Sequence, residues 1–145
     1  MLSSIKITPS HIVLYWGVDK YKIYDSSFNE ITNILIALRA ITPNKIIIEK
    51  PYIKLFGGLN TPPSELIERI ELLQGIYSIL VWEITTKHHL KPLCVAPNEY
   101  RRDKSHLNKY ELLEHARALF DPSLPNNVLL TLLDCAFMYK YGELN

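Results

Sequence analysis

The chain has 145 residues, of which 48% are hydrophobic and 21% are charged, and its formal net charge at pH 7 is +1. A chain of this length and composition is expected to form one globular domain, residues 1–145. The near-zero net charge excludes a strongly basic nucleic-acid binder of the histone type, but it leaves room for a local basic patch.

The sequence shows neither a secretory signal nor an apolar run of roughly 18 residues that could span a bilayer. We therefore expect an intracellular, cytoplasmic protein with no membrane partner. Its two cysteines, Cys94 and Cys135, both lie in apolar runs. Free, buried thiols are favoured in such a protein, and a single disulfide is the alternative if the chain comes from a hyperthermophile.

The first part of the chain predicts three successive strands and then a helix. Residues 3–8, 11–17 and 21–25 are the strands, separated by a Pro-Ser break and by a turn that contains Asp19. Ser27, followed three residues later by Glu30, has the pattern of a capping box. Apolar residues then recur on one helical face (Phe28, Ile31, Ile34, Leu35 and Leu38).

The second part alternates strands and helices. Residues 45–49 form a continuous apolar strand that ends in Glu49, a pattern typical of a central strand covered on both faces. A long helix is expected from about Ser64, and a short strand over residues 92–96. Asn108 and Glu111 predict the start of the next helix, and residues 127–141 the last one. The predicted element order is βββαβαβαα.

Two carboxylates stand at positions where their apolar elements would normally carry another apolar residue. Glu49 ends the strand over residues 45–49, and Asp134 lies within Leu-Leu-Asp-Cys-Ala-Phe of the last helix. Burying an ionised carboxylate is costly unless a cation or hydrogen-bond donors meet it, so the pair suggests a shared metal-binding centre. The alternatives are a solvated strand end for Glu49 and a solvent-facing helix position for Asp134.

Several short segments, in order, resemble the RuvC-like Holliday junction resolvases. Ile-Thr-Pro-Ser at residues 7–10, continuing to Tyr-Trp-Gly-Val at 15–18, resembles the opening Ile-Asp-Pro-Gly strand and its turn. Ile-Glu-Lys-Pro-Tyr at 48–52 is similar to the family's central-strand Glu motif, and Leu-Asp-Cys-Ala at 133–136 to the end of its Asp-Ala-Ala-Asp-Ala-Leu helix. The resemblance implies an α/β, ribonuclease H-like fold. Its five-stranded mixed sheet has three antiparallel strands followed by two parallel ones, with helices on its sides.

Carried over residue by residue, the resemblance keeps Glu49 and Asp134 as metal ligands but places neutral side chains at the two other acidic positions. The first-strand Asp corresponds to Thr8, and the second acid of the last helix to Thr131, one turn before Asp134. Asp19 is the alternative first-strand residue, although that alignment leaves too little chain for the hairpin strands. Because Mg²⁺ and Mn²⁺ favour anionic oxygens, losing two charges of four should weaken metal occupancy severely.

The resemblance also implies contacts with nucleic acid. Four basic residues occupy the segment that contacts phosphates in the family: Arg101, Arg102, Lys104 and Lys109. Tyr52 and Phe56 lie in the loop after the Glu strand, where an aromatic side chain can wedge into a junction or stack on a base. The alternatives are a solvated basic loop and aromatic side chains that pack against the protein.

Three functions remain open from the sequence. The first is a homologue that binds branched or structured DNA, such as a four-way junction, with nuclease activity lost or reduced because Thr8 and Thr131 replace acids. The second is an active Mg²⁺- or Mn²⁺-dependent structure-specific endodeoxyribonuclease. The third is a structural or assembly protein that keeps only the fold. The resemblance further implies a homodimer, with the helix from Ser64 as its interface.

Overall fold

The computed structural model describes residues 1–51, 63–104 and 106–145. The described residues form a mixed five-stranded sheet with the order β3-β2-β1-β4-β5. Its strands are β1 (Leu2–Ile7), β2 (His11–Gly17), β3 (Lys20–Asp25), β4 (Lys45–Glu49) and β5 (Leu93–Val95). The first three strands pair antiparallel, whereas β4 pairs parallel with β1 and with β5. This confirms the predicted arrangement of three antiparallel strands followed by two parallel ones.

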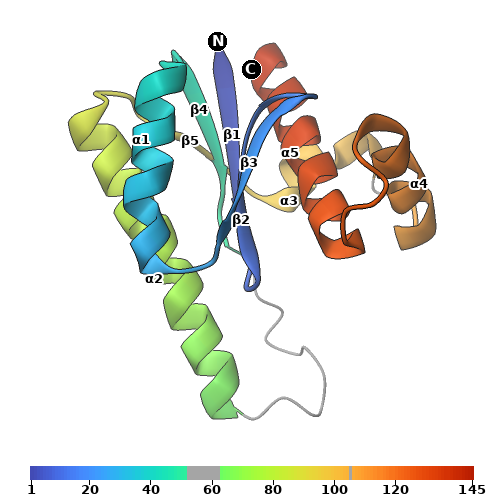
Figure 1. Ribbon diagram of the computed structural model, residues 1–145, viewed down its shortest axis with the longest axis horizontal. Coiled ribbons are helices and arrows are strands. Elements are labelled where there is room, and N and C mark those ends of the chain that lie inside the picture. Colours follow the sequence, from blue (N-terminus) through green and yellow to red (C-terminus); the bar gives the residue numbers. More distant parts are fainter. Residues whose placement is uncertain (52–62, 105) are drawn as a thin grey trace.

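Helices cover both faces of the sheet (Figure 1). On one face lie α1 (Ile31–Ile41) and the long α2 (Pro63–Lys87); on the other lie α4 (Lys109–Leu119) and α5 (Asn126–Leu144). The short α3 (Pro97–Tyr100) and the 3-10 turn η2 (Arg102–Lys104) connect β5 to α4. The element order therefore follows the sequence prediction, with α3 added in a segment that was expected to be a basic loop.

The central strand β1 sends its side chains alternately to the two helical layers. Ile5 and Ile7 belong to the core shared with α1 and α2. On the opposite side Ser4 donates its hydroxyl proton to the carbonyl of Cys135 on α5 (2.9 Å). Because successive strand residues face opposite ways, Lys6 points toward α5 as Ser4 does. This alternation brings a cation to the face where the acids of the sequence analysis converge.

Local capping differs between two predicted helix starts. The Asn108–Glu111 capping box is confirmed, since each side chain bonds the other residue's backbone N–H. The predicted capping box at Ser27 is wrong, because the Ser27 side chain makes no cap hydrogen bond. A 3-10 turn, η1 (Phe28–Glu30), precedes α1 there, and the Glu30 carboxylate accepts a hydrogen bond from Asn33 Nδ2 at 3.0 Å.

The described residues contain two free cysteines, Cys94, which is partly buried, and Cys135, which is buried. This agrees with the free thiols favoured by the sequence. None of the helices in the described ranges is both long and apolar enough to cross a membrane.

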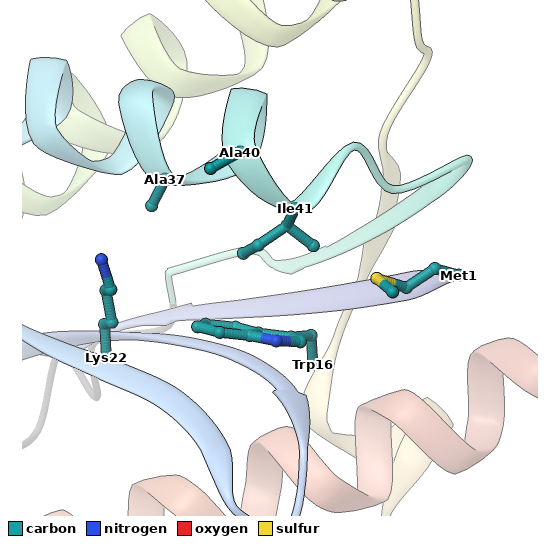
Figure 2. Close-up of a pocket in the computed structure, with 6 residues that line it drawn as sticks. All are labelled: Met1, Trp16, Lys22, Ala37, Ala40 and Ile41. Carbon is teal, nitrogen blue, oxygen red and sulfur yellow. The ribbon is translucent and has the colours of Figure 1, made fainter.

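A hollow of about 320 Å³ separates α1 from β2 and β3, on the face away from α5 (Figure 2). Met1, Trp16 and Ile41 are the larger apolar side chains in its lining, and Lys22 is the one charged side chain among the described residues that line it. Among the described residues that line this hollow there is no carboxylate, so the two acids do not meet here.

Candidate functional site

The two acids of the sequence analysis lie together on the α5 side of the sheet. Glu49 is the last residue of β4 and is 5% exposed, and Asp134, in the middle of α5, is also 5% exposed. A single ammonium group joins them: Lys6 Nζ lies 2.5 Å from Asp134 Oδ2 and 3.5 Å from Glu49 Oε2. The structure thus brings together two carboxylates that most of the chain separates.

Strand register explains why Lys6 occupies this position. In the parallel pair of β1 and β4, Ser4 is opposite Ile47 and Ile5 is opposite Ile48. The next step places Lys6 beside Glu49, on the same face of the sheet. The first strand therefore presents a cation where the sequence analysis expected the neutral side chain of Thr8.

A second cation, Arg101, also binds Asp134. It lies on the connection between β5 and α4, directly after α3. Its Nε donates to Asp134 Oδ1 at 2.9 Å, and its other nitrogen Nη2 bonds Oδ2, so the contact is bidentate. Burial lowers the pKa of Arg101, but the hydrogen bond and charge of Asp134 outweigh it and raise that pKa above the ordinary value. Both oxygens of Asp134 are consequently engaged by fixed positive groups.

Tyr100 completes the set by donating its hydroxyl proton to Glu49 Oε2. The ring is 7% exposed, and the Arg101 guanidinium lies 5.7 Å from its centroid. Burial raises the pKa of Tyr100, and the charges of Asp134 and Glu49 raise it further, so the hydroxyl stays a donor. The short helix α3, which Pro97 begins, is the element that aims Tyr100 and Arg101 at the two acids.

Thr8 and Thr131 belong to a neighbouring hydrogen-bond network around His11. The Thr8 hydroxyl donates to the His11 carbonyl (2.7 Å), and the Thr131 hydroxyl donates to the Asn127 carbonyl (2.9 Å). Thr131 Oγ1 then accepts from His11 Nε2 at 2.8 Å, and the Ser10 hydroxyl lies 2.8 Å from Nδ1. Burial and the charge of Lys6 lower the pKa of His11, which favours the neutral ring.

Asp19, the alternative first-strand acid, lies in the exposed turn between β2 and β3. The Lys6 ammonium, by contrast, is only 13% exposed and reaches both buried acids. The turn position agrees with the preference stated above for Asp19 as a turn residue.

The donor set does not fit a divalent metal. Mg²⁺ and Mn²⁺ need several free anionic or carbonyl oxygens. Here Lys6 and Arg101 occupy both oxygens of Asp134, and Lys6 and Tyr100 occupy Oε2 of Glu49. Among the described residues there is no group of three or more His, Cys, Asp or Glu side chains that could hold a metal.

The residues expected to contact nucleic acid divide into three groups. Arg101 lies inside the acidic centre, as described above. Lys104 is half-buried, while Arg102 and Lys109 are exposed, with Lys109 opening α4. Tyr52 and Phe56 fall outside the described residues.

No protein-family model and no curated protein sequence matches this chain. Solved structures do match. "T. thermophilus RuvC in complex with Holliday junction substrate" is similar with a TM-score of 0.60 at 12% identity, over 98% of this chain and 94% of that chain. "Thermus thermophilus RuvC structure" is similar with a TM-score of 0.54, again at 12% identity and over the same shares. The chain has a RuvC-like fold.

The site contains two residues that the sequence did not single out, Lys6 and Tyr100. Neither residue had a usable signal in the sequence. The place of Lys6 beside Glu49 follows from the register between β1 and β4. The position of Tyr100 depends on the four-residue helix α3, which is too short for a periodic pattern.

Proposed function

We propose that this protein binds branched or structured DNA and that it cleaves DNA weakly or not at all. The observation that carries the proposal is the pair of cations, Lys6 and Arg101, seated on the carboxylates of a RuvC-like fold. Phosphodiester hydrolysis by two metals requires acids that are free to coordinate them. Carboxylates that are already paired with cations of the protein itself are not free to coordinate metal ions.

Support for the DNA ligand comes from the fold and from the basic segment. The similar protein with the higher TM-score is described in complex with a Holliday junction substrate. In this chain Arg102, Lys104 and Lys109 come shortly after Arg101 in sequence, on the connection into α4 and at the start of that helix. Side chains of this type bind phosphates without reading base sequence, which suits a ligand recognised by its shape.

We also propose that the protein acts as a homodimer through α2. Three large apolar side chains on this helix are exposed: Ile67 (54%), Ile79 (41%) and Trp82 (67%). Their helical spacing puts them on the side away from the buried residues of α2 (Leu73, Ile76, Leu80 and Ile84). A two-fold dimer would bury this face and would match the symmetry of a four-way junction.

The test measures binding and cleavage on the same four-way junction. Binding should weaken steeply as salt rises, and the triple variant Arg102→Gln, Lys104→Gln, Lys109→Gln should lose most of it. Lys91→Gln, an exposed lysine outside the basic segment, is the matched control. Efficient nicking of the junction by the wild-type protein with Mg²⁺ or Mn²⁺ would refute the loss of activity.

An active endonuclease is the second candidate, because Glu49 and Asp134 do reach a common cation. For that function, metal-dependent nicking must occur and must disappear in Glu49→Gln. If the protein binds no junction at any salt concentration, the third possibility, a protein that retains only the fold, replaces both.

A further inference from the structure

A cavity of about 470 Å³ lies where α3 and η2 meet the C-terminal half of α5. Tyr100 forms part of its wall, and the hydroxyl of the same residue reaches Glu49. The cavity therefore borders the acidic centre but has its own lining. Its volume falls in the range of about 300–1,000 Å³ that is usual for small-molecule sites.

Helical periodicity brings aromatic and cationic side chains together in this cavity. Phe137, Lys140 and Tyr141 are spaced three and four residues apart on α5, so they share one side of the helix. Phe137 and Tyr141 are partly buried and Lys140 is exposed. Two aromatic rings are thus held by the core, with an ammonium group beside them.

Positive charge dominates the described lining. Arg102 and Lys104 come from η2, and Lys140 from α5, whereas Glu99 is the single acidic residue. Aromatic rings beside cations are the combination that binds single-stranded nucleic acid, because bases stack on the rings while cations meet the phosphates. A purely apolar ligand would make no use of the charged side chains in this lining.

We propose that this cavity binds one unpaired nucleotide of a DNA strand. Its base stacks on Tyr141, with Phe137 in the same lining, and its phosphates lie near Lys104 and Lys140. The proposal rests on the proposed DNA-binding function and adds to it a subsite for unpaired bases, such as those at an opened junction centre.

The experiment compares three labelled probes by fluorescence anisotropy at low salt. One is a short thymidine oligomer, the second has the same phosphates but abasic sugars at its centre, and the third is a fully paired four-way junction. The wild-type protein should bind the thymidine oligomer roughly five- to a hundredfold more tightly than the abasic one. Tyr141→Leu should remove most of this preference, and Lys140→Gln should weaken both oligomers.

Control variants lie outside the cavity lining: Tyr110→Leu, which removes a 65% exposed ring, and Lys91→Gln. Neither should change the preference. The comparison within the wild-type protein, together with the exposed Lys140→Gln, keeps the test valid if Tyr141→Leu does not fold.

The outcomes separate the two proposals. Equal affinity for the thymidine and abasic oligomers, with the junction still bound, refutes the subsite and leaves the proposed function in place. A base preference that survives in Tyr141→Leu, or oligomer affinities that stay unchanged in Lys140→Gln, also refutes the subsite. A base preference without junction binding refutes the branched-DNA function but supports the subsite, and failure to bind all three probes refutes both.

Discussion

Replacing Lys6 by Asp is the most direct test of how the acidic centre is built. The substitution removes the ammonium that lies 2.5 Å from Asp134 and 3.5 Å from Glu49, and it puts a third carboxylate on β1 beside them. Because both acids are almost fully buried, losing their cation should destabilise the metal-free protein by about 3 kcal/mol. A divalent metal then has anionic ligands from β1, β4 and α5.

The metal-dependent recovery can be estimated. A weak oxygen-ligand site has a Kd of about 1 mM. At a Mn²⁺ concentration roughly tenfold above that Kd, the folded state gains about 1.4 kcal/mol. For a domain of this size the gain corresponds to a rise in Tm of about 4 °C.

Thermal unfolding followed by circular dichroism, with EDTA or with Mn²⁺, measures this rise. Lys6→Met removes the cation without adding a ligand and should show no specific response to Mn²⁺. Thr8→Asp tests the competing alignment, in which Thr8 holds the first-strand position. A rise in Tm with Mn²⁺ in Thr8→Asp, and none in Lys6→Asp, would show that the reasoning from strand register is wrong.

Three further predictions concern stability and assembly. Gly142→Ala places a methyl group against the fully buried Ile47, so it should lower the free energy of urea unfolding by about 1–3 kcal/mol. Gly75→Ala meets only the ring of Phe28, which is 47% exposed, and should lower that free energy less. Equal losses in the two variants would contradict this. Burial and the charge of Lys6 lower the pKa of His11 below 6.5. The neutral ring therefore stabilises the folded protein fully above pH 6.5, and this stabilisation is lost as the pH falls toward the pKa of the folded state. Stability measured at pH 7.5 and 5 should thus drop in the wild-type protein, and His11→Gln should drop less. Trp82→Asp should convert a dimer to a monomer in sedimentation velocity, and a wild-type monomer would contradict the α2 interface.

Much of the fold could be predicted because its signals are local. The apolar run of β4 and the Asn108–Glu111 box both act within a few residues, and the structure bears them out. The Ser27 box failed because two competing local structures, a 3-10 turn and an α-helix, share the same start signals. Glu49 and Asp134 could be predicted because each is an acidic residue in an otherwise apolar element, and such an interruption is visible in a single sequence.

The partners of those acids could not be predicted in the same way. A lysine in an alternating strand is normally read as solvent-facing, and only the β1–β4 register turns Lys6 inward. Arg101 was assigned to phosphates because it belongs to a basic segment, but α3 turns it toward Asp134. Long-range ion pairs of this kind depend on topology, so they become visible only when the sheet is assembled.

The charge balance of the centre bears on how nucleic acid can approach it. Two carboxylates face two fixed cations, so the group carries no net charge. A cluster of uncompensated acids repels a polyanion until ions from solution screen it. A centre that is neutral by itself imposes no such barrier on a polyanion, even in the presence of a chelator.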